Sequence, residues 1–139
     1  MIVLDTNVLS ELLRPKPDSR VLGWLVGQPS AALFTTAVSQ GEILYGILLL
    51  PAGKRRQKLW DAVHGIFAED FGGRVLGFDL EAAPLYAEIG AARRSAGRPI
   101  AQFDCQIAAM TRAHGATLAT RNVRDFEACG IDVVNPWQP

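Results

Sequence analysis

Residues 2–6 of the chain read Ile2-Val3-Leu4-Asp5-Thr6, so that three apolar side chains run directly into a carboxylate and a hydroxyl. A continuous apolar run of this kind is typical of a strand that is covered on both faces, as in a parallel sheet. In open α/β sheets, ligands bind outside the carboxyl ends of such strands. Asp5 therefore has two interpretations at this point: a cap for the helix that follows, or a ligand at a functional site.

The composition is that of one folded domain, and we expect residues 1–139 to form a single unit. Hydrophobic residues make up 49% and charged residues 20%, which excludes a disordered chain. Fourteen basic and fourteen acidic side chains cancel, so any contact with nucleic acid must use a local patch.

The longest apolar run, 43–50, is too short to span a bilayer. Neither a signal peptide nor a metal-binding cysteine spacing is evident, and we expect a cytoplasmic protein that makes no use of a membrane.

Apolar periodicity and turn residues divide the chain into alternating strands and helices. The pattern predicts strands over 2–4, 31–36, 74–78, 116–120 and 131–134, and helices over 8–13, 21–25, 38–50, 54–67, 80–95, 100–114 and 123–129. This alternation favours right-handed crossovers and an α/β fold with a mainly parallel sheet and helices on both faces. Two of the helices follow each other across a Pro/Gly turn, which predicts a helical hairpin.

Three acidic residues stand in apolar surroundings: Asp5, Glu42 and Asp104. Each also has a purely structural interpretation. Ser39 and Glu42 match the spacing of a capping box, and Asp104 would complement the dipole of a helix in its first turn. Because the carboxyl ends of parallel strands meet at one edge of a sheet, we expect these three carboxylates to converge on one crevice.

Converging carboxylates repel and raise each other's pKa unless a cation neutralises them. Hard cations such as Mg²⁺ or Mn²⁺ prefer carboxylate and water oxygens. A site of this kind suits phosphodiester hydrolysis, because the metal ion polarises the phosphoryl group and supplies a hydroxide at neutral pH. A further ligand is expected from the segment 120–126.

Five motifs lie in order along nearly the whole chain: Val3-Leu4-Asp5-Thr6-Asn7, Glu42 after Thr36-Ala37-Val38, Asp104 between Ile100-Ala101 and Ile107-Ala108-Ala109, Thr120-Arg121-Asn122, and Asn135-Pro136-Trp137. Their combination resembles the PIN-domain ribonucleases. More closely, the chain is similar to the VapC-type toxins of bacterial toxin-antitoxin pairs, in their FitB-like branch.

This resemblance implies a three-layer α/β/α fold and a Mg²⁺- or Mn²⁺-dependent endoribonuclease that hydrolyses RNA with a metal-activated water. It assigns Asp5, Glu42 and Asp104 as catalytic, metal-binding acids and places the hydroxyl of Thr6 beside them. It also implies inhibition by a cognate antitoxin, a homodimer, and contact with DNA only through the antitoxin complex.

The fourth ligand position departs from the family pattern. Many relatives have Asp there, whereas this chain has Asn122, whose carbonyl could reach a metal ion directly or through water with one negative charge fewer. Asp125 either compensates for that charge or is a helix cap or surface acid. Arg121, next to the predicted site, is a candidate for contact with a phosphate.

Two basic clusters are candidates for a track that binds RNA, because phosphate contacts gain from counterion release. They comprise Lys54, Arg55, Arg56 and Lys58, and Arg93, Arg94 and Arg98. The alternative is that both clusters are solvated helix faces.

Two rival functions remain open. One is a phosphatase in which Asp5 attacks phosphorus, although such sites generally need a second Asp two residues later and this chain has Asn7. The other is a catalytically weak or inactive PIN-fold partner that acts mainly in an antitoxin-bound DNA-binding complex, which the presence of Asn122 favours.

Overall fold

The computed structural model describes all of residues 1–139 and contains one five-stranded sheet in the order β3-β2-β1-β4-β5. Its strands are β1 (Ile2–Leu4), β2 (Leu33–Thr36), β3 (Val75–Leu76), β4 (Thr117–Ala119) and β5 (Asp132–Val134). Every pair of neighbouring strands is parallel, and Val3 of β1 lies opposite both Phe34 and Leu118. The predicted parallel sheet is confirmed.

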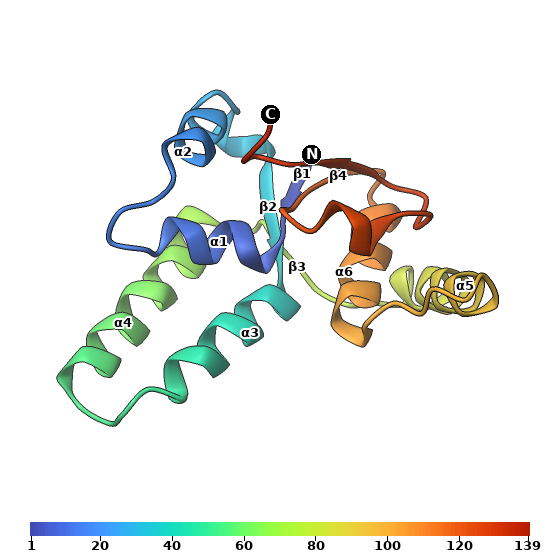
Figure 1. The fold of residues 1–139 in the computed structure, drawn as a ribbon. Helices are drawn as coiled ribbons and strands as arrows, with labels where there is room; N and C mark the ends of the chain where they lie inside the picture. Colours follow the sequence, from blue (N-terminus) through green and yellow to red (C-terminus); the bar gives the residue numbers. More distant parts are fainter.

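Six α-helices surround this sheet (Figure 1). They are α1 (Thr6–Leu12), α2 (Ser19–Val26), α3 (Ala37–Leu48), α4 (Lys54–Gly65), α5 (Ala82–Ser95) and α6 (Gln102–Ala113). Helices α3 and α4 form the expected hairpin, and α4 continues into a π-helical segment, Ile66–Asp70. No helix is both long and apolar enough to cross a membrane.

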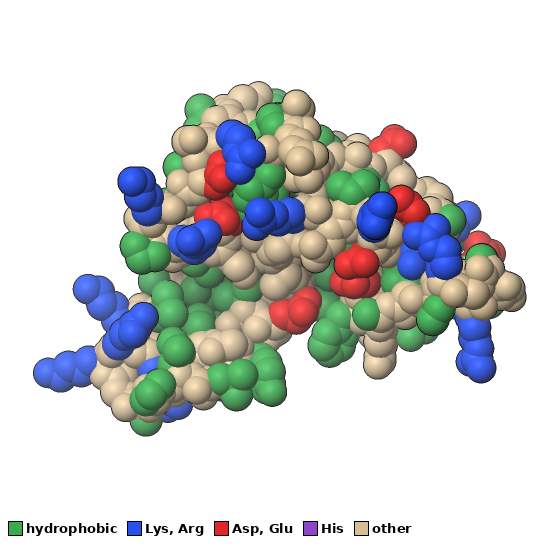
Figure 2. Space-filling model, in the orientation of Figure 1, with side chains coloured by type: hydrophobic (Ala, Val, Ile, Leu, Met, Phe, Trp, Pro, Cys, Tyr) green, Lys and Arg blue, Asp and Glu red, His purple; other side chains and the backbone are tan.

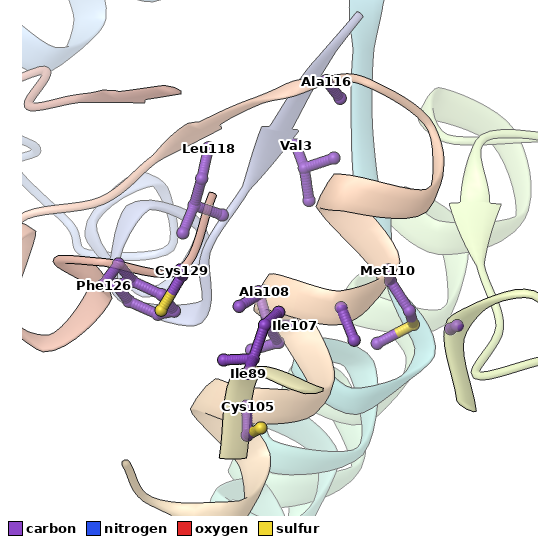
Figure 3. Close-up of a cluster of buried hydrophobic side chains, with 12 residues drawn as sticks. Val3, Ile89, Cys105, Ile107, Ala108, Met110, Ala116, Leu118, Phe126 and Cys129 are labelled. Carbon is purple, nitrogen blue, oxygen red and sulfur yellow. The ribbon is translucent and has the colours of Figure 1, made fainter. Parts of the chain in front are cut away.

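Two hydrophobic cores lie on opposite faces of the sheet. Val3 and Leu118 point to a core shared with α5 and α6, where they meet Ile89 and Ile107 (Figure 3). The adjacent residues Leu4 and Ala119 point to the other core, with α1 to α4. Successive side chains of a strand alternate between its faces, so β1, the middle strand of the sheet, is apolar at every position. The three-layer α/β/α architecture is thus confirmed.

The strand expected over 74–78 is reduced to Val75–Leu76, and two further predicted elements give way in part to 3₁₀ turns. The helix expected over 123–129 is a 3₁₀ helix, Val123–Phe126, because Glu127 is extended and Ala128 adopts a left-handed φ of 59°. The strand expected over 31–36 begins only at Leu33, because Ser30–Ala32 forms another 3₁₀ turn.

The strand order places a switch point beside β1. The chain runs from β1 to β2 and β3 in one direction and then returns to form β4 on the other side of β1. A crevice is expected outside the carboxyl ends of the strands where the order reverses. Asp5 follows β1 and Thr120 follows β4, so both lie at that point.

Candidate functional site

Asp5 is a buried carboxylate whose two oxygens are held by different elements. Oδ1 accepts a hydrogen bond from the backbone N–H of Thr6 at 2.8 Å, which makes Asp5 the N-cap of α1. Oδ2 accepts from Oγ1 of Thr120 at 2.7 Å and from Nδ2 of Asn7 at 3.2 Å. The predicted cap is therefore confirmed. This capping role still allows Asp5 to bind a metal ion, because a carboxylate has about four acceptor positions and these hydrogen bonds do not use all of them.

Glu42 lies in α3 and faces α1. The hydroxyl of Thr6 is 2.8 Å from Oε1 of Glu42 and 2.9 Å from Oγ of Ser39. The capping-box alternative for Glu42 is wrong, because α3 begins at Ala37 and its N-cap is Thr36, whose Oγ1 accepts from the N–H of Ser39 at 3.1 Å. Glu42 is thus free of a capping role and lies against the residue that follows Asp5.

Asp104 lies in the first turn of α6, half-buried, as the sequence predicted. It shares one cavity of about 470 Å³ with Asp5 and Glu42. The cavity is lined almost entirely by polar residues, namely Asp5, Thr6, Asn7, Ser10, Glu11, Arg14, Glu42, Asp104, Arg121 and Asn122, together with Trp137. The predicted convergence of the three acids is therefore observed.

The electrostatics of the cavity show an excess of negative charge. The pKa of Asp104 is raised to about 6, first by burial and then by the nearby charges of Asp5, Asp125 and Glu42, while Arg93 acts in the opposite direction. Burial also raises the pKa of Asp5, against the hydrogen bonds from Thr120 and Thr6 that stabilise its ionised form. A group of acids that disfavours its own ionisation would be stabilised by a cation.

The donor set fits one kind of cation site. No three His, Cys, Asp or Glu side chains are arranged to bind a metal ion by themselves. Mg²⁺ is usually bound by one or two carboxylates and keeps several water molecules. Oxygen donors spread around an open cavity fit that mode, and they do not fit a closed site made only of protein ligands.

The sequence matches the PIN domain family model over residues 2–130. The chain belongs to the PIN-domain family. It is 43% identical over 139 residues to the VapC ribonuclease Y4jK of Sinorhizobium fredii, covering 100% of this chain and 99% of that protein. It is 39% identical over 137 residues to the toxin FitB of Neisseria gonorrhoeae, covering 99% of each. The structure of FitAB bound to an IR36 DNA fragment matches with a TM-score of 0.94 at 38% identity, over 100% of this chain and 97% of that one.

Arg121 and Asn122 of this PIN domain line the cavity beside the acids. The guanidinium of Arg121 lies 5.0 Å from the ring centroid of Trp137, and its backbone N–H donates to Oδ1 of Asn7 at 3.2 Å. Asp125 is exposed and does not line the cavity, but its charge raises the pKa of both Asp5 and Asp104. Asp125 is therefore an acid at the margin of the site.

The first predicted basic cluster lies at the start of α4 and contributes no residue to the cavity. Basic side chains project from the tip of the α3–α4 hairpin, away from the acidic residues (Figure 2). The guanidinium of Arg56 already forms hydrogen bonds within the hairpin, because it donates to the carbonyl oxygens of Leu48 and Leu50. The remaining members, Lys54, Arg55 and Lys58, are exposed.

The second basic cluster needs a correction. Arg94 and Arg98 are exposed, and Arg98 pairs with Glu127 at 2.7 Å. Arg93 is buried, with 6% of its surface exposed, and its guanidinium binds backbone carbonyls. The prediction that Arg93 contacts RNA is wrong, because the side chain points into the protein.

Sequence reasoning did not identify three polar residues that orient the acids of the PIN-domain site. Thr120 and Asn7 orient Asp5, and Ser39 shares the hydroxyl of Thr6 with Glu42. Thr120 follows a strand that the fold places next to β1, so the order of the strands would have identified it.

Proposed function

We propose that this PIN domain is a metal-dependent endoribonuclease toxin that hydrolyses RNA phosphodiester bonds. The observation that carries the proposal is the convergence of Asp5, Glu42 and Asp104 on one polar cavity at the switch point of the sheet. Similarity over the full chain to the VapC ribonuclease Y4jK supports the same reaction.

Asp5, Asp104 and Glu42 would hold a Mg²⁺ or Mn²⁺ ion, in part through its water molecules, with the amide oxygen of Asn122 as a further donor. A bound ion of this kind polarises the phosphoryl group and lowers the pKa of its water. Asp5 is oriented by the hydrogen bonds from Thr6, Thr120 and Asn7, which fix the direction of its remaining lone pairs. Supporting hydrogen bonds of this type raise metal affinity by fixing the ligand in place.

Arg121 would contact a phosphate of the RNA. Its guanidinium lines the cavity and lies over the ring of Trp137, which restricts its position through a cation–π interaction. Arginine suits phosphate because its planar group can donate two parallel hydrogen bonds. The exposed basic residues of α4 and Arg94 and Arg98 would add only a weak attraction that decreases with salt.

We also propose that a cognate antitoxin inhibits this chain, that the toxin forms a homodimer, and that it reaches DNA only through the antitoxin complex. The match to FitAB bound to a DNA fragment supports contact with DNA within a complex, and the homodimer and the inhibition follow from the family resemblance alone. We propose a cytoplasmic location on the same basis, where both RNA and antitoxin would be present.

The test is cleavage of end-labelled RNA by the purified chain with Mn²⁺ or Mg²⁺, with Mn²⁺ binding followed by electron paramagnetic resonance. Asp5→Asn should lower the cleavage rate on the order of 100-fold or more, because it removes a charged ligand. Asp132→Asn changes an exposed aspartate of β5 in the same way and should leave the rate unchanged.

Three outcomes would count against the proposal. Wild-type protein that cuts no RNA at saturating Mn²⁺ would favour the catalytically inactive partner. An aspartyl-phosphate trapped on Asp5 would favour the phosphatase. Cleavage by Asp5→Asn at the wild-type rate would remove Asp5 from the mechanism.

A further inference from the structure

Arg93 is a buried arginine that forms no ion pair. Only 6% of its surface is exposed. Its Nη1 donates to the carbonyl oxygens of Asp125 at 2.9 Å and Glu127 at 3.0 Å, and its Nε donates to that of Arg98 at 2.8 Å. Burying a charge without a counter-ion costs free energy that neutral acceptors offset only in part.

Arg93 holds a segment whose backbone is strained. The 3₁₀ helix Val123–Phe126 ends in an extended Glu127, and Ala128 follows with a φ of 59°. A left-handed conformation costs a non-glycine residue about 1–2 kcal/mol. It persists only where the surrounding structure fixes it. The two carbonyls bound by Nη1, those of Asp125 and Glu127, immediately precede this turn.

The same segment is connected to Asp5 by an unbroken series of hydrogen bonds. The N–H of Asp125 donates to the carbonyl of Asn122 at 3.0 Å, and the N–H of Asn122 donates to Oγ1 of Thr120 at 3.1 Å. The hydroxyl of Thr120 donates in turn to Oδ2 of Asp5 at 2.7 Å. Arg93 thus lies at the outer end of a series that ends on the buried acid of the cavity.

We propose that Arg93 is a positioning residue that holds residues 122–129 in the conformation that presents Asn122 and the charge of Asp125 to the carboxylate cavity. Asn122 lines that cavity, and Asp125 is close enough to act on both Asp5 and Asp104. This role rests on the proposed function, since it assumes that the cavity binds a cation. It assigns a buried side chain of α5, a helix that carries none of the three acids, to the binding of that cation.

The experiment compares Arg93→Met, which keeps the length of the apolar stem, with Arg93→Lys, which keeps the charge. Arg124→Ala is the matched control, because it removes an exposed arginine side chain of the same segment that forms no hydrogen bond. Three quantities are measured on the full chain: Mn²⁺ affinity by electron paramagnetic resonance, hydrogen exchange of the Asp125 amide, and kcat and KM for RNA.

We expect Arg93→Met to weaken Mn²⁺ binding about tenfold, the size of effect seen when a group that orients a metal ligand is removed. The Asp125 amide should exchange faster, and kcat should fall while KM changes little, because the RNA contacts at Arg121 remain. Arg93→Lys should restore only part of the affinity, since an ammonium cannot reproduce the fixed fork of a guanidinium. Arg124→Ala should match wild type in all three.

A folded Arg93→Met variant with wild-type Mn²⁺ affinity and kcat would overturn the proposal. If Arg93→Met does not fold, the same criteria apply to Arg93→Lys, and failure of both to fold would assign Arg93 to folding alone and overturn it as well. Failure of the proposed function is distinguishable, because wild-type protein would then neither bind Mn²⁺ nor cut RNA. Unchanged exchange of the Asp125 amide in Arg93→Met would still refute the role of Arg93.

Discussion

The two walls of the polar cavity differ in how firmly their acids are held. On the wall built from the ends of β1 and β4, both oxygens of Asp5 accept hydrogen bonds, from Thr6, Thr120 and Asn7. On the wall built from α3 and α6, Glu42 accepts only from the hydroxyl of Thr6, and no hydrogen bond to Asp104 is present. One wall is therefore fixed by the fold, and the other has unused acceptor capacity.

This difference shows how a fold can prepare a site for a cation. A carboxylate that is fully oriented gives precise geometry, while a carboxylate with free lone pairs can adjust to the ion and its water. The burial that both walls share raises the pKa of Asp5 and Asp104. Thr120→Val weakens the fixed wall, Asp104→Asn neutralises the open wall, and Thr6→Val removes the hydrogen bond between the two walls.

The largest effect is expected for Thr120→Val, which disrupts the fixed wall. Its buried hydroxyl donates to Asp5 and accepts from Asn7 and from the N–H of Asn122. Removing it leaves a buried carboxylate without its shortest donor, which should lower the free energy of unfolding by about 2 kcal/mol. Urea denaturation near neutral pH measures this quantity.

Thr117→Val is the matched control for that change. Thr117 lies in β4, the strand that Thr120 follows, and its side chain forms no hydrogen bond in the structure, so the cost should stay below about 0.5 kcal/mol. Equal losses in the two variants would mean that the hydrogen bonds around Asp5 do not hold the wall.

Asp104→Asn neutralises the open wall and should increase stability without metal at neutral pH. The pKa of Asp104 is raised from 3.8 to about 6, so its favourable contribution to folding is complete below about pH 4 and is lost as the pH rises through 6. After allowance for screening at a half-buried site, Asn should add about 1 kcal/mol at pH 7 and nothing near pH 4.

Thermal denaturation in EDTA at both pH values measures this difference, with Asp132→Asn as the exposed control. The structural interpretation of Asp104 predicts the opposite sign, because removing a charge that complements the dipole of α6 would lower the stability of the variant at pH 7. A lower melting temperature for Asp104→Asn would therefore contradict the interpretation that burial and the neighbouring acids disfavour the ionised form of Asp104.

The acids of the cavity were predictable because each contradicts its local surroundings. Asp5 follows three apolar residues, and Asp104 interrupts an otherwise apolar helix face, so a single sequence is enough to single them out. Their convergence was also predictable, since a parallel sheet collects strand ends at one edge. The binding of a cation remains a prediction.

Other features depend on contacts that no local pattern contains. Arg93 precedes a second arginine, a pattern that is typical of a solvated helix face. Its side chain is buried because its guanidinium binds carbonyl oxygens more than 30 positions away in the sequence. The cap of α3 was misplaced because Thr36 and Ser39 both suit an N-cap, and only the end of β2 decides between them. The left-handed Ala128 has no sequence signal, since such positions favour glycine.

The smallest effect is expected for Thr6→Val, which removes the hydrogen bond between the two walls. Glu42 is partly exposed and can bind water instead, and Ser39 keeps its contact with Oγ1 of Thr36 at 3.3 Å. The free energy of unfolding should therefore fall by only about 0.5 kcal/mol, at the low end for a hydrogen bond. Mn²⁺ affinity should fall less than in Asp5→Asn, because an acid of the open wall can still reach the ion when its orientation is released. Urea denaturation and electron paramagnetic resonance measure the two quantities. A loss of Mn²⁺ affinity as large as that of Asp5→Asn would show that Glu42 needs the orientation that Thr6 provides, and the two walls would then be equally fixed.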